Sequence, residues 1–361
     1  MNYKTEIDEL AQSIPRDIAD FNLPLKKKNP PTQASSEFVT NREQGDWAER
    51  LVIRAINKTS DKFVAVQYGK ADRLIAGEPG FNDFYNKYQQ ELLEIGKRPD
   101  VLIFRTEDYD FDWSFNISEF PPEMLNKIVP KALAGLEIRS SSFLIEEYDE
   151  DLRRRLVEQR SETSKVLEEI LRYSDLLADE ARVALEDLNP LTFENYPSRI
   201  RLDRSERSKE VRALLKRLGS LKKQLTQTRD FLSFTPKVED LKVVLKWIQV
   251  YGVPHYYFQV FFDKVYGISF SQILQLTANP LNRNKRFYVE RDTKNQLKST
   301  IKVNVREGDE VAYKVTMPVH RSELKKLPRG RLLFHVAFEG GEAYLNLGTL
   351  YGLLQLEQRG K

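Results

Sequence analysis

Two short apolar runs, each beside a carboxylate, constrain the fold of this chain more than any other feature of its sequence. Residues 98–104 read RPDVLIF, and residues 134–143 read AGLEIRSSSF. Apolar residues directly after Asp100 predict a buried strand, and the second run predicts another. Side chains alternate along a strand, so Glu137 and Arg139 share one face while Ile138 points into the core. If the strands are adjacent, Asp100 and Glu137 converge at a sheet edge beside a fixed cation.

The remaining periodicity predicts an α/β protein with a charged helical insertion. The patterns predict helices from Asp46, over 83–95 and over Val238–Tyr251, and strands over 62–68 and 255–262. Gly252 and Pro254 are typical of the end of a helix. Residues 269–276 fit either a helix or a short strand. Several β-rich stretches over 285–347, separated by turn residues, predict an antiparallel subdomain.

We expect five segments along the chain. The first is a peripheral arm with one short helix, because it contains four prolines and no sustained periodicity. The segments are an N-terminal arm (1–45), the first half of a core (46–145), a helical insertion (146–237), the second half of the core (238–280) and a β-rich C-terminal subdomain (281–361).

The composition excludes several kinds of active site. The 361 residues include no Cys and three His, with 57 Lys+Arg against 54 Asp+Glu and a net charge of +3. The absence of Cys removes thiolate nucleophiles, iron–sulfur clusters and Cys-based zinc sites. His255, His320 and His335 show no metal-ligand spacing. No apolar run is long enough to span a membrane, and the first ten residues are unlike a signal peptide. Carboxylates must therefore carry any metal site, and two of them with water suit Mg²⁺.

The two apolar runs also carry a family resemblance. RPDVLIF followed by GLEIRSSSF resembles the PD-(D/E)xK nuclease signature, with Pro99-Asp100 as its first half and Glu137-Ile138-Arg139 as its second. A helix bearing Glu49 resembles the first core helix of that superfamily, and residues 238–276 resemble its helix-then-strand continuation. Within the superfamily, the chain looks most like the AccI-like type II restriction endonucleases. The resemblance covers residues 46–143 and 238–276.

This resemblance implies a fold, a reaction and partners. The fold would be a restriction-endonuclease-like α/β core, a mixed central sheet flanked by helices. The reaction would be Mg²⁺-dependent, sequence-specific hydrolysis of double-stranded DNA by metal-activated water, leaving a 5′-phosphate and a 3′-hydroxyl. Asp100, Glu137, Arg139 and Glu49 would be catalytic, and Asp100, Glu137 and the Ile138 carbonyl would bind the metal. A bacterial cytoplasmic homodimer paired with a DNA methyltransferase is implied, with no membrane attachment.

Two departures from the family pattern stand out. Residues 101–136 separate the two halves of the motif, so residues 107–130 must form an excursion between adjacent strands. Arg139 stands where most members have Lys. Because an arginine is effectively always protonated, it cannot act as a general base. We expect Arg139 to orient the scissile phosphate or the nucleophile and to stabilise the transition state. Lys97 is a candidate substitute for the missing lysine.

Each candidate also has a purely structural interpretation. Asp100 fits a turn before a strand, and Glu137 fits a buried ion pair with an arginine. Asp46 and Glu49 have the spacing of a helix capping box. Gln259 either flanks the active site or lies on a solvated strand face.

Residues 199–229 are strongly basic, with eleven Lys/Arg against three acidic residues. Such a segment is either a solvated helix or an electrostatic footprint for DNA phosphates. Long charged helices fit dimerisation equally. The candidate DNA-contact residues are Lys97, Arg201, Arg204, Arg207, Lys209, Lys216, Lys222 and Lys223.

Two other functions compete with a restriction enzyme. One is a structure-specific repair or recombination nuclease. The other is a non-catalytic DNA-binding protein, in which Arg139 would mark a degenerate site. A Mg²⁺-dependent digest of plasmid DNA discriminates among the three.

Overall fold

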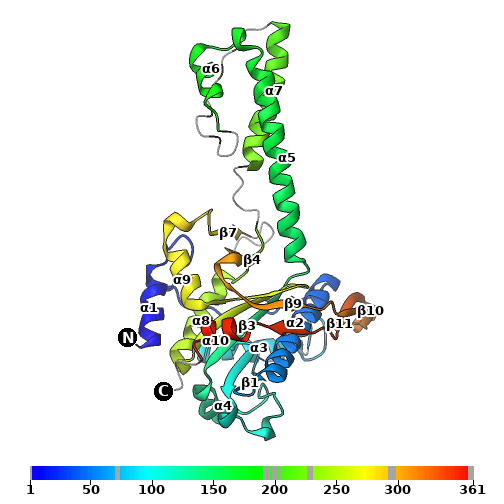
Figure 1. The fold of residues 1–361 in the computed structure, drawn as a ribbon. Coiled ribbons are helices and arrows are strands. Elements are labelled where there is room, and N and C mark those ends of the chain that lie inside the picture. Colours follow the sequence, from blue (N-terminus) through cyan, green and yellow to red (C-terminus); the bar gives the residue numbers. More distant parts are fainter. Residues whose placement is uncertain are drawn as a thin grey trace. The chain divides into compact units, whose positions relative to one another are not determined.

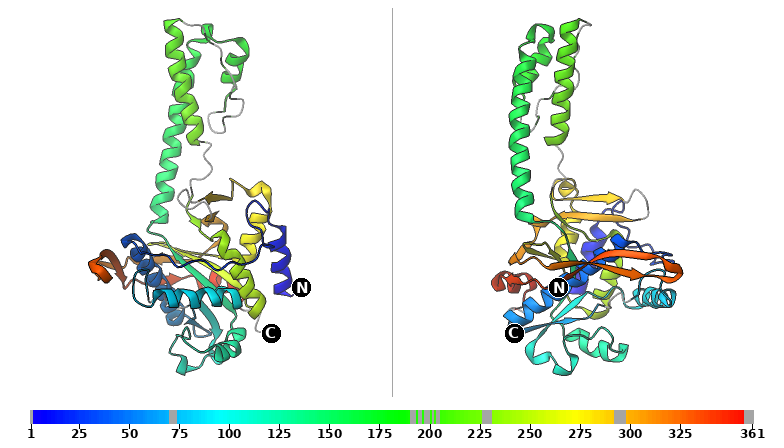
Figure 2. Two further views of the ribbon diagram at one scale, coloured as in Figure 1. Left: turned by 180° about the vertical axis from the view of Figure 1, so that it is seen from behind. Right: turned by 90° about the vertical axis from the view of Figure 1, so that its right-hand side faces the viewer.

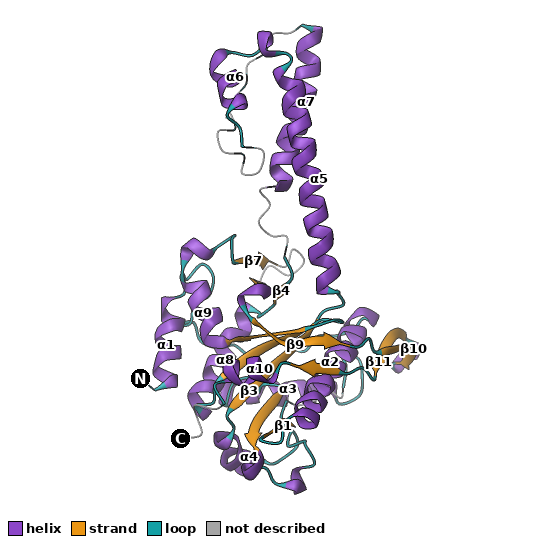
Figure 3. Ribbon diagram, in the orientation of Figure 1, coloured by secondary structure: helices purple, strands orange, loops and turns teal. Residues whose placement is uncertain are grey.

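A computed structural model describes residues 2–69, 74–189, 205–225, 231–291 and 298–356, with positions 193, 196, 200 and 202. The chain forms two compact units. One comprises Met1–Ile145 with Phe231–Lys361, and the other comprises Glu146–Asp230. Figure 1 labels their elements and Figure 3 separates helices from strands.

The first unit contains a mixed seven-stranded sheet in the order β1-β2-β3-β5-β6-β9-β12. Its strands are β1 (Phe63–Gln67), β2 (Val101–Arg105), β3 (Ala134–Ser140), β5 (His255–Val260), β6 (Val265–Ser269), β9 (Asp309–Val315) and β12 (Ala343–Leu345). Only the β3–β5 pair is parallel; the other pairs are antiparallel. This arrangement confirms a mixed α/β fold and the expected pairing of the two motif strands.

The described residues of the first unit also form helices. They are α1 (Tyr3–Ser13), α2 (Ser36–Thr59), α3 (Phe81–Glu94), α4 (Pro122–Ile128), α8 (Val238–Tyr251), α9 (Phe270–Ala278) and α10 (Leu347–Leu354). The excursion between β2 and β3 contains α4 and three short 3₁₀ turns. The expected helix 238–251 is confirmed, and Gly252 ends it with a positive φ of 74°.

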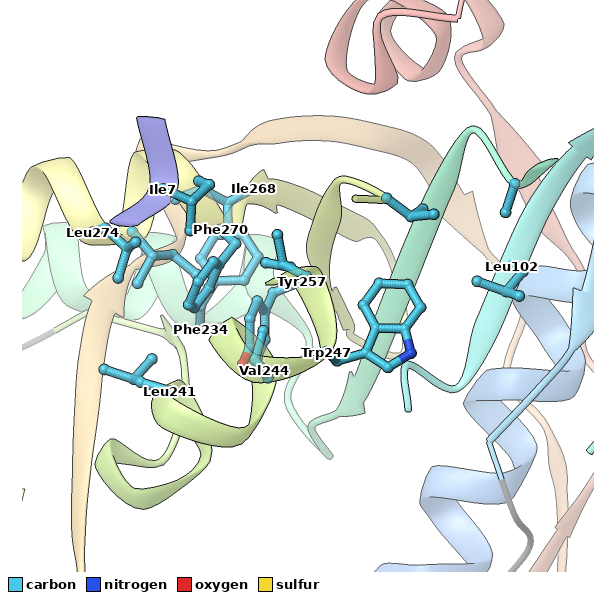
Figure 4. Packing of buried hydrophobic residues seen from close by; sticks show 14 of the residues in the cluster. Ile7, Leu102, Phe234, Leu241, Val244, Trp247, Tyr257, Ile268, Phe270 and Leu274 are labelled. Atoms are coloured by element: carbon cyan, nitrogen blue, oxygen red, sulfur yellow. The ribbon is translucent and has the colours of Figure 1, made fainter. Parts of the chain in front are cut away.

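Alternating strand residues separate two cores. Leu102, Tyr257 and Ile268 pack with α1, α8 and α9 on one face, where Figure 4 shows Trp247 and Phe270 among them. On the other face, neighbouring strand residues such as Val101, Ile103 and Phe258 pack against α2 and α10. Glu137 and Arg139 interrupt the apolar pattern of β3, while Ile138 joins the α2-side core. The expected orientation of these three side chains is confirmed.

The N-terminal region differs from the expectation in two ways. Helix α2 begins at Ser36, not Asp46, because the Ser35 side chain accepts a hydrogen bond from Phe38 N at 3.0 Å. The capping-box interpretation of Asp46 and Glu49 is therefore wrong, since both lie inside α2. The first 40 residues are not peripheral either: Ile7 of α1 is fully buried in the main core.

The C-terminal part is divided among three sheets. A three-stranded sheet joins β4 (Ser233–Phe234), β8 (Ser299–Asn304) and β7 (Phe287–Arg291), and a hairpin joins β10 (Val319–Lys326) and β11 (Leu332–Glu339). These small sheets agree with the expected β content. However, β9 and β12 extend the central sheet. The sequence pattern does not predict this, because β9 joins the sheet through β6, and β6 is not predicted as a strand. Residues 269–276 are helical in α9, capped by Ser269.

The second unit is helical. It contains α5 (Ile145–Leu171), α6 (Asp179–Glu186) and α7 (Glu206–Leu225). The two long helices lie side by side (Figure 2) and are antiparallel, since Arg207 pairs with Asp175 beyond the end of α5 while Arg217 pairs with Glu162 within it. Their apolar residues, including Ile170 and Leu218, form a separate small core. No helix in the described part of the chain has the length and hydropathy needed to cross a membrane.

Candidate active site

The β2–β3 pairing brings the two halves of the predicted motif together. Val101 is the register partner of Leu136, so Asp100 lies beside the Glu137–Ile138 peptide. Asp100 Oδ2 accepts a hydrogen bond from Ile138 N at 2.6 Å, which fixes the carboxylate against the neighbouring strand. Gly69 follows β1, and a Cβ there would lie 2.9 Å from the Asp100 Cα. Glycine therefore allows the chain after β1 to approach Asp100 closely.

Asp100 opens into a polar pocket of about 500 Å³. Several elements contribute to its walls: α2 supplies Glu49, β3 supplies Arg139, the loop before β2 supplies Lys97, and the first turn of α8 supplies Asp240. The predicted residues Glu49, Asp100, Ile138 and Arg139 thus reach one cavity from positions far apart in the sequence.

Four alternating charges lie together at this pocket. Lys97 Nζ lies 2.5 Å from Glu137 Oε1 and 3.3 Å from Asp240 Oδ2. Arg139 forms an ion pair with Glu137 Oε1 and lies 3.8 Å from Asp240 Oδ2. The structure therefore contains the ion pair between Glu137 and an arginine that the alternative interpretation predicts. The second carboxylate oxygen, Glu137 Oε2, is buried and has no hydrogen-bond partner in the described structure.

These ion pairs set the protonation of the charged groups. Burial alone would raise the pKa of Glu137 and of Asp240. Arg139 and Lys97 outweigh burial for Glu137 and lower its pKa, and Lys97, Lys237 and Arg139 lower the pKa of Asp240 to about 2. Burial would lower the pKa of Lys97, but Glu137 and Asp240 raise it. All four groups of the cluster are therefore charged near neutral pH.

For Asp100 and Glu49, burial and neighbouring carboxylates outweigh the cations nearby, Arg139 for both groups and also Lys97 for Asp100. Burial, followed by repulsion from Glu137, raises the pKa of Asp100 to about 7. Burial and repulsion from Asp100, Asp46 and Glu137 raise the pKa of Glu49 well above its usual value. Within the described residues, neither carboxylate has a Lys, Arg or His nitrogen at ion-pair distance. A bound cation would relieve this repulsion.

The donor set fits a hard divalent cation. Asp100, Glu49 and the unpartnered Glu137 Oε2 offer carboxylate oxygens, the ligands that Mg²⁺ prefers while it keeps several waters. No group of three or more Asp, Glu or His side chains in the described residues is already arranged around a metal position. Glu137 is fully buried and paired with Lys97 and Arg139, and it is not among the residues that line the pocket.

Sequence reasoning missed two residues of this site and misjudged a third position. Asp240 and Lys237 line the pocket from the start of α8, and no motif connects them with Asp100. The one available signal is the order of elements. Helix α8 directly precedes β5, the strand that pairs in parallel with β3, so α8 is expected near the motif strands. Gln259, the β5 register partner of Arg139, is 2% exposed, so the interpretation of a solvated face is wrong.

Comparison with known proteins assigns the chain to a family. The sequence matches the family described as AccI restriction endonuclease over residues 1–360. The chain belongs to the AccI restriction endonuclease family. It is therefore a type II restriction endonuclease, a phosphodiester hydrolase that cleaves double-stranded DNA sequence-specifically. The AccI family match also includes the helical unit and the C-terminal strands, which the motif resemblance did not cover. No curated protein and no solved structure matches significantly.

The candidate DNA contacts of this AccI-family chain have varied surroundings. Lys97 lies in the active-site pocket rather than on an open surface. Within the helical unit, Arg207 pairs with Asp175 at 2.9 Å and Lys209 with Glu206 at 2.6 Å. Lys222 lies over the Tyr196 ring at 4.2 Å. Lys216 and Lys223 are exposed, and Arg201 and Arg204 lie outside the described residues.

Proposed function

We propose that this restriction endonuclease uses Mg²⁺ held by Asp100, Glu137 and the Ile138 carbonyl, with Glu49 as a further acidic group of the same site. The observation that carries this proposal is the convergence of two half-buried carboxylates without an ion-pair partner in the described structure, Asp100 and Glu49, beside the buried Glu137 Oε2, which has no hydrogen-bond partner. When bound, Mg²⁺ would supply an activated water and neutralise charge on the scissile phosphate.

Arg139 takes the position of the usual lysine in this proposal. Glu137 raises the pKa of its guanidinium further, so Arg139 remains a fixed cation. It orients the phosphate and stabilises negative charge that develops in the transition state. Lys97 lies against the same Glu137 oxygen and also remains protonated. Proton removal from the nucleophile therefore falls to solvent or to a substrate phosphate.

The central strands and helices correspond, in this proposal, to a restriction-endonuclease-like core. The products would carry a 5′-phosphate and a 3′-hydroxyl. A palindromic DNA site is matched by two-fold protein symmetry, so we propose a homodimer in which each subunit cuts one strand. A cognate DNA methyltransferase would protect the host genome.

A digest tests the metal site. Plasmid and phage DNA are incubated with the protein and Mg²⁺, with and without EDTA, and the band pattern also gives the recognition sequence. We expect discrete bands that disappear with EDTA and in Asp100→Ala. Asp8→Asn, which removes an exposed carboxylate on α1, is the matched control and should cut normally. Full cleavage by Asp100→Ala, or in EDTA, would refute the assignment.

A further inference from the structure

Glu137 lies in a position that is awkward for a metal ligand. It is fully buried, its Oε1 is shared by Lys97 and Arg139, and it does not line the pocket that Asp100 and both cations line. A cation bound at Asp100 and Glu137 would repel both of them. For Glu137 to become a ligand, Lys97 and Arg139 need another anion at the same place.

Asp240 is that anion. Its Oδ2 already lies 3.3 Å from Lys97 Nζ and 3.8 Å from Arg139 Nη2, and it lines the pocket. Its helix is rigidly placed, since Leu241 and Val244, just after it, are fully buried in the main core. Glu91 also lines the pocket, but Arg98 already engages it at 2.6 Å.

We propose that Asp240 is the exchange partner that takes Lys97 and Arg139 from Glu137 when the divalent metal binds. The inference rests on the proposed metal site at Asp100 and Glu137. No bond is made or broken: two cations shift from one carboxylate toward another that they already contact. Asp240 is thus a positioning residue, which keeps both cations beside the pocket while it frees Glu137 for the metal.

The exchange also explains why the cluster has equal numbers of opposite charges. With Glu137 and Asp240 both ionised, Lys97 and Arg139 are neutralised in the metal-free protein. After exchange, Asp240 retains them both, and the charge of Glu137 becomes available to the metal. Without Asp240, Glu137 would be the only carboxylate among the described residues at ion-pair distance from both cations.

Direct titration of DNA-free protein with Mg²⁺, by calorimetry, tests this role. We expect Asp240→Asn to weaken Mg²⁺ binding by about 10-fold or more, a typical result of removing a group that orients a metal ligand. Asp240→Glu should bind metal close to the wild type. Glu239→Gln removes the adjacent carboxylate, which lies 3.9 Å from Lys28 and outside the four-charge cluster, and should have no effect.

Asp240→Asn also removes one negative charge, and this alone would weaken Mg²⁺ binding at long range even without an exchange. Two double variants with the same net charge separate the effect of charge from the effect of the exchange. Lys97→Met in the Asp240→Asn background removes one of the two cations that hold Glu137, and should restore part of the Mg²⁺ affinity, since Arg139 still pairs with Glu137. Lys237→Met in the same background restores the same net charge near the pocket. It should not restore affinity, because no ion pair joins Lys237 to Glu137 in the described structure. Equal restoration by both variants would overturn the exchange.

The same titration of Asp100→Asn separates this inference from the metal site on which it rests. If Asp100→Asn abolishes Mg²⁺ binding while Asp240→Asn binds normally, the site stands and the exchange is refuted. If Asp100→Asn also binds normally, the metal site itself is wrong. Thermal melts of each variant identify any loss of folding, and Asp240→Ser is titrated in place of Asp240→Asn if the latter does not fold.

Discussion

Arg139 differs from a lysine in ways that substitution can measure. Its guanidinium pairs with Glu137, and the side chain is 35% exposed and lines the pocket, where a phosphate could reach it. We expect Arg139→Ala to lower kcat by about 100-fold or more, the usual loss on removing a group that stabilises transition-state charge. Arg139→Lys should retain measurable activity because it keeps the charge.

Single-turnover cleavage of a plasmid, with DNA affinity measured separately in Ca²⁺, checks this prediction. Gln259→Ala removes the buried neighbour of Arg139 in the parallel strand and controls for local packing. Unchanged cleavage by Arg139→Ala would exclude a catalytic role for the arginine.

The raised pKa of Asp100 gives the metal-free protein a pH-dependent stability. Its carboxyl titrates near pH 7 when folded but near 3.8 when unfolded, so the folded state holds the proton more tightly. This residue's contribution to stability therefore falls as pH rises from about 4 to about 7 and is constant above that.

Asp100→Asn removes this penalty while an amide oxygen still accepts the Ile138 N–H hydrogen bond. In EDTA, the variant should melt at a higher temperature than the wild type at pH 8, and at nearly the same temperature at pH 4. A variant that melts lower at pH 8 would contradict the assigned protonation. Added Mg²⁺ should stabilise only the wild type.

The sequence predicted some residues of the site and not others for a physical reason. Asp100, Glu137 and Arg139 belong to neighbouring strands, and strand alternation alone places two of them on one face. Glu49 was placed correctly on a helix, but its local capping role was wrong because the helix is capped by Ser35, well before Asp46. Asp240 reaches the site only through the packing of α8, and no local pattern encodes that contact.

At the scale of elements, one glycine sets the distance between the loop before β2 and helix α8. Gly96 has a φ of 84°, and a Cβ there would overlap the Val243 carbonyl oxygen and the Trp247 backbone nitrogen. Lys97 N, the next residue, donates a hydrogen bond to Val243 O at 2.9 Å. This close approach brings Lys97 within reach of Asp240 on the same helix.

Gly96→Ala should therefore lower the free energy of unfolding by about 1–3 kcal/mol, because it combines an unfavourable φ with a backbone overlap. It should lower cleavage as well. Gly45→Ala is the control: that glycine lies inside α2 with no neighbour within 4 Å, and alanine should stabilise the helix by up to about 1 kcal/mol. Urea unfolding measures both changes. Equal stability of the two variants would refute the role of Gly96.

Most elements with strong periodicity were predictable, including β1, α3, α8 and β5. Strand β6 was not, because VYGIS is short and contains a glycine, and without it the sequence could not place β9 in the central sheet. The helix end at Gly252 was predictable since it depends only on local backbone conformation. Sheet order depends on contacts between distant segments and is not encoded locally.

At the scale of the whole molecule, the number of lysines and arginines overstates the positive charge that is available to contact DNA phosphates. Residues 199–229 are rich in lysine and arginine, yet Arg207, Lys209 and Arg217 are each paired with an acidic side chain within the helical unit. Lys216 and Lys223 are exposed on α7 and have no carboxylate at ion-pair distance among the described residues. If this unit contacts DNA phosphates, these two lysines are the best placed to do so.

Salt dependence of DNA binding tests that contact. Each neutralised phosphate contributes about 0.9 to the slope of log K against log salt, so K216A/K223A should reduce the slope by about 2. K127A/K131A removes the same charge from exposed positions near α4 and should leave the slope nearly unchanged. Binding is measured in Ca²⁺ at several salt concentrations, with sedimentation in parallel. An unchanged slope with a shift from dimer to monomer would instead assign the helical unit to dimerisation, because its exposed lysines would then contact the partner subunit rather than DNA.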